Sequence, residues 1–207
     1  MDRYRNRREA GRVLTQELEN LDLPVDTIVL GLPRGGAVCA AEVAAGLGVR
    51  LDLLLVRKLG VPSHPEVAFG AIASGGFRVL NASVAAALSD EEVEQVVRKE
   101  VRELDRRVAA YGVRALSFTG RCVVIVDDGL ATGATMRVAI EAARSQRPDR
   151  IIAAVPVAAA EAVAMIRPLV DDLVCPLVPS TFLSVGEWYL DFVQVTDAEV
   201  IRLMAGD

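Results

Sequence analysis

The segment from Cys122 to Met136, CVVIVDDGLATGATM, constrains the fold of this chain more than any other stretch. Its run of apolar residues predicts a strand buried on both faces, as is typical inside a parallel sheet. Two adjacent acids, Asp127 and Asp128, end the strand, and the loop after them opens a helix. A strand that leads through a loop into a helix N-terminus creates a local anion site, because unpaired N–H groups and the positive end of the helix dipole meet there.

The loop between strand and helix has the chemistry of a phosphate-binding site. Gly133 lets the backbone approach a ligand closely, and the hydroxyls of Thr132 and Thr135 add hydrogen-bond donors. The two carboxylates upstream would repel a phosphate, so we expect them to bind vicinal hydroxyls or a hydrated Mg²⁺ ion. A phosphorylated sugar meets both requirements. The alternative to a binding site is a plain strand-to-helix turn with acids at the cap.

Alternating strand and helix patterns along the chain predict a single α/β domain with a mainly parallel sheet flanked by helices. The main strands are expected at 27–31, 51–56, 121–126, 151–157 and 172–177. Amphipathic helices are expected at 7–20 and from Ser89 onward, where Ser89 and Glu92 form a capping box. A long loop is expected to start at Arg57, and a glycine-rich turn to join two hairpin strands at 67–72 and 77–80.

Composition narrows the functional classes. The chain has 207 residues, of which 52% are hydrophobic, and its net charge of −5 argues against non-specific nucleic-acid binding. Its longest apolar run falls well short of the roughly 20 residues needed to span a bilayer, so no membrane association is expected. The N-terminus lacks an apolar signal core, and the three cysteines, Cys39, Cys122 and Cys175, lie in apolar stretches. We therefore expect a cytoplasmic protein with buried, reduced thiols.

The string from Cys122 to Met136 resembles the phosphoribosyl pyrophosphate signature of the type I phosphoribosyltransferases. The resemblance to that family spans about residues 25–195. It implies that family's α/β fold, with a core at about 21–178, an N-terminal helix at 7–20 and a small C-terminal hood at about 179–207. It implies that Asp127 and Asp128 hold the ribose 2′ and 3′ hydroxyls and help to bind Mg²⁺. The 5′-phosphate would lie in the loop formed by Ala131, Thr132, Gly133, Ala134 and Thr135.

A second strand-loop-helix unit contains Arg34 before the glycine pair Gly35 and Gly36. One guanidinium beside glycine amides suits a diphosphate, and the resemblance identifies this stretch as the diphosphate loop, which in the family often contains a non-proline cis peptide. By the same resemblance, Arg57 and Lys58 are candidates for further diphosphate contacts, although both could be ordinary loop cations. Residues 59–76 would be the flexible loop that closes over the bound sugar.

The C-terminal segment concentrates aromatic residues that either hold a planar base or belong to the core. In 6-oxopurine phosphoribosyltransferases a similar Val-Gly segment borders the base and a nearby Asp meets the metal. This implies base contacts for Val185 and Trp188 and a metal contact for Asp191, although one extra residue here separates Gly186 from the Leu-Asp pair.

The resemblance fails at Ala131, where 6-oxopurine enzymes have an Asp that handles the base proton. Adenine enzymes also have Ala there and use a Glu of the flexible loop, which makes Glu66 a candidate general acid or base. The lone histidine, His64, is a second candidate. A magnesium-dependent phosphatase with Asp127 as nucleophile is a weaker reading, because such sites favour an Asp-x-Asp spacing.

The resulting hypothesis is an Mg²⁺-dependent glycosyltransferase of nucleotide salvage. It transfers ribose 5-phosphate from phosphoribosyl pyrophosphate to a nucleobase, with a purine favoured, and releases diphosphate. The rival is a regulatory protein that binds phosphoribosyl pyrophosphate or a nucleotide and transfers nothing. The assembly, a homo-oligomer among the options, is left open.

Overall fold

The computed structural model describes residues 3–114 and 117–206, apart from the side chain of Glu66. Its core is a parallel sheet in the order β2-β1-β6-β7-β8. The strands are β1 (Ile28–Gly31), β2 (Arg50–Leu53), β6 (Cys122–Val126), β7 (Arg150–Ala154) and β8 (Asp172–Val174). The predicted α/β class is therefore confirmed, with the strands shorter than predicted at several ends.

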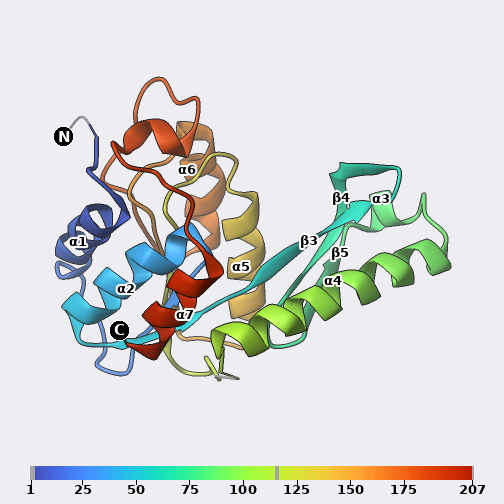
Figure 1. Cartoon of the computed structure of the whole chain (residues 1–207), viewed down its shortest axis with the longest axis horizontal. Coiled ribbons are helices and arrows are strands. Elements are labelled where there is room, and N and C mark those ends of the chain that lie inside the picture. Colours follow the sequence, from blue (N-terminus) through green and yellow to red (C-terminus); the bar gives the residue numbers. More distant parts are fainter. Residues whose placement is uncertain (1–2, 115–116, 207) are drawn as a thin grey trace.

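Helices cover both faces of this sheet, which is why its central strand is apolar throughout. Alternate residues of β6 point to opposite sides, and all five are buried. Val124 and its like-facing neighbours pack under α1 (Arg7–Leu18) and α2 (Gly35–Leu47). Ile125 packs on the other side under α5 (Ala134–Ser145) and α6 (Ala160–Ile166). Figure 1 shows the helices in these two layers.

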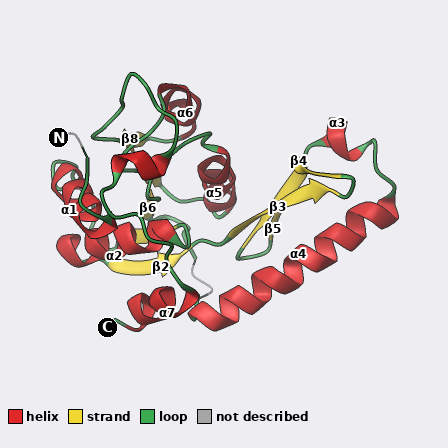
Figure 2. Cartoon of the chain, turned by 45° about the horizontal axis from the view of Figure 1, so that its top comes forward, coloured by secondary structure: helices red, strands yellow, loops and turns green. Residues whose placement is uncertain are grey.

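An arm extends from the core (Figures 1 and 2). It consists of an antiparallel sheet in the order β3-β4-β5 and of two helices. The elements are β3 (Val56–Val61), β4 (His64–Ala73), β5 (Phe77–Leu80), α3 (Ala82–Ala85) and α4 (Asp90–Tyr111). The hairpin and the capping box at Ser89 are as predicted. The predicted long loop after Arg57 is wrong, because residues 56–61 pair with β4 along their length.

The arm sheet is held by the apolar stripe of α4. Leu59, Phe69 and Ile72 are buried in one cluster with Val97 and Leu104 of the helix. Arg57 faces the same helix and forms an ion pair with Glu100. The segment 59–76 is thus the main part of a packed sheet and not an open loop.

A segment near the N-terminus pairs beside the core with a segment near residue 189. Tyr4 pairs with Tyr189, and the N–H of Tyr4 donates to the carbonyl of Trp188 at 2.8 Å. A short 3₁₀ turn, η1 (Arg167–Leu169), joins α6 to β8. The segment after β8 contains a second turn, η2 (Val185–Trp188), and then α7 (Asp197–Ala205), which contacts α2 and α4. Residues 179–207, which are predicted to form a hood, thus comprise η2, which lies beside Tyr4, and α7, which packs against α2 and α4.

The three cysteines are free. Cys39 and Cys122 are buried and Cys175 is half-buried, and burial raises the pKa of each thiol, to about 11 for Cys175. Since only the thiolate reacts, we expect the native protein at pH 8 to resist alkylation by iodoacetamide, and all three thiols to react after unfolding. Mass spectrometry of the two samples checks this. Rapid labelling of the native protein would contradict it.

Within residues 3–114 and 117–206, no helix is both long and apolar enough to cross a membrane.

Candidate functional site

The loop between β6 and α5 lines a cavity of about 190 Å³. Gly133 has a φ of 74°, a left-handed conformation that favours glycine, and the next residue begins α5. The first N–H groups of a helix have no backbone partner within it, and residues 134–136, which open α5, line this cavity. The lining residues are Asp127, Val185 and residues 129–136, so they include the whole predicted phosphate loop.

The paired acids stand in different environments. Burial and the neighbouring charge of Asp128 raise the pKa of Asp127 well above its usual value, while Arg7 acts in the opposite direction. Asp127 Oδ1 accepts the N–H of Asp128 at 2.9 Å. Asp128 Oδ2 instead accepts from Nε of Arg7 at 2.7 Å, in an ion pair whose side chains are 16% and 10% exposed. Of the two acids, Asp128 therefore has a fixed counter-charge.

The predicted diphosphate loop lies directly against these acids. The peptide between Pro33 and Arg34 is cis, as the resemblance implies. A Cβ atom at Gly35 would overlap Oδ2 of Asp128, and one at Gly36 would lie 2.8 Å from the Cα of Asp127. Neither glycine could carry a side chain without displacing a neighbour. The loop and the acids, which are more than 90 residues apart in sequence, thus form one site.

Arg34 is the residue before the first turn of α2 and has a partner outside the loop. Its Nη1 atom lies 3.6 Å from Oδ1 of Asp197, the first residue of α7. The hydroxyl of Tyr111, at the end of α4, donates to the same oxygen at 2.7 Å. The side chain of Arg34 is 35% exposed, so an anion at the loop can reach it.

The basic pair that follows β2 lies apart from this cavity. Arg57 and Lys58 are on β3, where both line a separate groove between the arm sheet and α4. His64 begins β4, and Nδ1 of its ring lies 3.0 Å from the hydroxyl of its neighbour Ser63. Glu66 is also on β4, and its side chain lies outside the described part of the structure. In this conformation Arg57, Lys58 and His64 do not line the phosphate-loop cavity.

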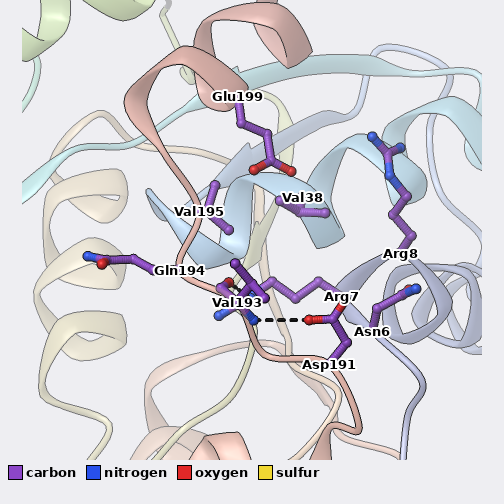
Figure 3. Close-up of a pocket in the computed structure, with 9 residues that line it drawn as sticks. All are labelled: Asn6, Arg7, Arg8, Val38, Asp191, Val193, Gln194, Val195 and Glu199. Carbon is purple, nitrogen blue, oxygen red and sulfur yellow. Dashed lines mark hydrogen bonds between the residues drawn. The ribbon is translucent and has the colours of Figure 1, made fainter.

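The three C-terminal candidates have different positions. Val185 lines the cavity, where its methyl groups would be the nearest atoms to a Cβ atom placed on Gly129. Trp188 packs against the cluster formed by α1, α2 and the sheet, and its indole N–H is buried without a partner among the described residues. Asp191 accepts the N–H of Val193 at 3.2 Å and lines a second cavity beside Arg7 (Figure 3).

The described residues do not contain a group of three or more His, Cys, Asp or Glu side chains placed to hold a metal ion. Asp191 is thus not clustered with the paired acids. Mg²⁺ commonly binds proteins through one or two carboxylates together with phosphates and water. The paired acids could supply two carboxylates to such an ion, and the described residues do not add a third to them.

Two residues important to this geometry have no local sequence signal. Arg7 lies in an arginine-rich segment, and its partner Asp128 is 121 residues away. Tyr189 is one of several aromatic residues in the C-terminal segment, and its hydroxyl donates to the carbonyl of Asp128 at 2.6 Å. The pairing of Tyr4 with Tyr189 beside the core brings Arg7 and Tyr189 to the site.

Comparison with known proteins agrees with the site. Residues 5–192 match the family model described as a phosphoribosyl transferase domain. TT1426 from Thermus thermophilus, a crystal structure, is 42% identical, with a TM-score of 0.87 over 99% of this chain and 98% of that one. AQ2163 from Aquifex aeolicus is 14% identical, with a TM-score of 0.51 over 87% and 78%, and shares the fold.

Curated relatives from two strains of Mycobacterium tuberculosis, both provisionally named phosphoribosyl transferases, are 43% identical over 99% of this chain. The match covers 47% of each relative, so the chain spans about half their length. The family model, in contrast, covers most of the chain and includes the phosphate loop, the paired acids and the diphosphate loop. On that evidence the chain belongs to the phosphoribosyl transferase domain family.

Proposed function

We propose that this protein transfers ribose 5-phosphate from phosphoribosyl pyrophosphate to a nucleobase nitrogen, with release of diphosphate. The observation that carries the proposal is the contact between the two loops. Gly36 lies against the Cα of Asp127, and Gly35 against the carboxylate of Asp128. A site for a diphosphate, a pair of hydroxyl acceptors and a site for a phosphate thus follow one another in the order in which phosphoribosyl pyrophosphate presents these groups.

Each part of the site has a distinct task in this proposal. The N-terminus of α5 and the hydroxyls of Thr132 and Thr135 bind the 5′-phosphate. Asp127 and Asp128 accept the ribose hydroxyls. Arg34 and the amides of Gly35 and Gly36 bind the diphosphate, and their charge stabilises it as it leaves. The bond from C1′ to the diphosphate oxygen breaks, a bond from C1′ to the base nitrogen forms, and the base loses its N–H proton.

Mg²⁺ enters this proposal with the substrate. A divalent ion that arrives with the diphosphate would neutralise charge on the leaving group. Asp127 and Asp128 are the residues that would hold such an ion, since Asp191 lines another cavity. The metal contact that the resemblance implies for Asp191 is therefore the weakest part of the predicted metal set.

The tasks listed above do not assign a residue that takes the proton from the base. Ala131 is exposed at the cavity, and Asp127 is the one titratable side chain among the described residues that line it. This observation favours the second candidate function, a protein that binds phosphoribosyl pyrophosphate without transferring it. The transfer function requires instead an acceptor base that brings no demanding proton transfer, or a residue of the arm such as Glu66 that reaches the site when substrate is bound.

A base screen separates the two functions. We expect one of adenine, hypoxanthine, guanine, xanthine, uracil or orotate, with the purines tested first, to give diphosphate release from phosphoribosyl pyrophosphate and Mg²⁺. Melting curves recorded with the same substrate report binding alone, because a ligand that binds the folded state raises its stability. Stabilisation without turnover for all six bases would support the regulatory candidate, and neither stabilisation nor turnover would overturn both.

A further inference from the structure

Arg7 differs from the other arginines of the N-terminal segment. Arg5, Arg8 and Arg12 have exposed side chains and form ion pairs with Glu9 or Glu42 at the surface. Arg7 is buried, and its side chain runs beneath the segment that contains Val193 (Figure 3). A buried guanidinium is costly unless its donors are satisfied and its charge is paired. The groups that pair with the buried guanidinium of Arg7 therefore indicate its role.

Those partners belong to the phosphate site and to the segment beside it. Nε of Arg7 donates to Asp128 Oδ2 at 2.7 Å, and Nη1 donates to the carbonyl of Val193 at 2.9 Å. The guanidinium carbon lies 3.8 Å from the centre of the Phe192 ring, a cation–π contact. One side chain thus ties the start of α1 to the second acid of the pair.

Asp128 is consequently held at its side chain and at both of its peptide groups. Arg7 binds one carboxylate oxygen, Tyr189 donates to the carbonyl, and the N–H donates to Asp127. Gly35 of the diphosphate loop lies against the same carboxylate oxygen and close to Nε of Arg7. The carboxylate cannot rotate without breaking its contact with Arg7.

Charge supplies a second reason for this arrangement. The proposed substrate carries a phosphate and a diphosphate, and two bare carboxylates beside it would repel it. The guanidinium of Arg7 is the counter-charge of one of them, so it reduces that repulsion while it leaves the carboxylate able to accept a hydroxyl. Arg8, one residue further on, faces Glu42 instead and takes no part.

We infer that Arg7 is a positioning residue for substrate binding: it holds the Asp128 carboxylate in the orientation that accepts a ribose hydroxyl of phosphoribosyl pyrophosphate. This inference rests on the proposed function. It predicts that the effect of Arg7 on substrate affinity passes through Asp128 and through no other group.

A double-mutant cycle tests that route. Calorimetry would measure the affinity for phosphoribosyl pyrophosphate with Mg²⁺ for the wild type, Arg7→Met, Asp128→Asn and the double variant. We expect each single variant to lose at least about tenfold in affinity, the order of one charge-assisted hydrogen bond. The double variant should bind no more weakly than Asp128→Asn, because Arg7 then has no carboxylate to orient.

Two further variants complete the design. Arg8→Met is the matched control, which removes a neighbouring charge and a surface ion pair and should bind as the wild type does. Arg7→Lys keeps the charge that the buried site needs, and the cycle is repeated with it in case Arg7→Met does not fold. Lysine lacks the planar fork of arginine, so partial recovery of affinity is expected.

The outcomes are distinguishable. Losses that add in the double variant would overturn the inference, because Arg7 would then act by packing against Val193 and Phe192. An unchanged affinity in Arg7→Met or in Arg7→Lys with an intact fold would also overturn it. A wild type that binds no phosphoribosyl pyrophosphate would overturn the proposed function, and the inference with it.

Discussion

Replacement of both Asp127 and Asp128 by asparagine is expected to abolish detectable binding of phosphoribosyl pyrophosphate with Mg²⁺. Each charge-assisted hydrogen bond to a hydroxyl contributes about 1.5–3 kcal/mol, so the loss of two such bonds should lower affinity by a factor of about 10² to 10⁴. Turnover, where a base is found that reacts, should fall at least as far. Calorimetry and diphosphate release measure the two effects.

The same two substitutions are expected to differ in their effect on stability. Folding raises the pKa of Asp127, mainly by burial, so the folded state binds a proton at this carboxylate more readily than the unfolded state does. This group therefore destabilises the fold increasingly as the pH rises above its unfolded pKa of about 3.9. Asp127→Asn removes that cost and should not lower the melting temperature at pH 7. Asp128→Asn should lower it, because Arg7 is left without its carboxylate.

Asp172→Asn is the matched control for both measurements. Its carboxylate also pairs with an arginine, Arg150 at 2.6 Å, but at strand β8 on the edge of the sheet. It should leave substrate binding unchanged. A double variant at positions 127 and 128 that retains wild-type affinity would sink the assignment of the paired acids, whatever base the protein uses.

Local signals in the sequence are sufficient to predict the phosphate loop. The strand before it is apolar on both faces because helices cover both, and Gly133 is required by its positive φ. Both causes act within a few residues, so the local sequence is enough to predict the loop. The glycine pair indicates the diphosphate loop, yet the close approach to Asp128 that explains the pair depends on a contact 93 residues away.

The arm is poorly predicted from local sequence because its order comes from a distant partner. Pro62, Pro65 and the glycines of residues 59–76 favour a loop by local preference. The apolar stripe of α4, which includes Val97 and Leu104, needs a surface to cover it, and the sheet that contains Leu59 and Phe69 supplies that surface. The apolar stripe of α4 is therefore the sequence signal that indicates a packed sheet in residues 59–76.

Replacement of Gly35 by alanine should have the next largest effect, for a reason that only the structure supplies. The new Cβ atom would overlap Oδ2 of Asp128 and lie 2.5 Å from its Cγ. A flexible side chain would move aside at little cost, but this carboxylate is held by Arg7. Either the carboxylate leaves Arg7 or the diphosphate loop moves away from the acids, and both changes separate groups that must bind one substrate.

We expect Gly35→Ala to weaken binding of phosphoribosyl pyrophosphate about 100-fold, the order of effect found when a binding group is displaced by about 1 Å. The control is Gly48→Ala at the other end of α2, where φ is 65° and no atom lies within 4 Å of the new Cβ. It should cost about 1–2 kcal/mol of stability through its backbone conformation and leave affinity unchanged. If Gly35→Ala bound like the wild type, the diphosphate could not lie between this loop and Asp128. The geometry that joins the two loops into one site would then have no role in binding.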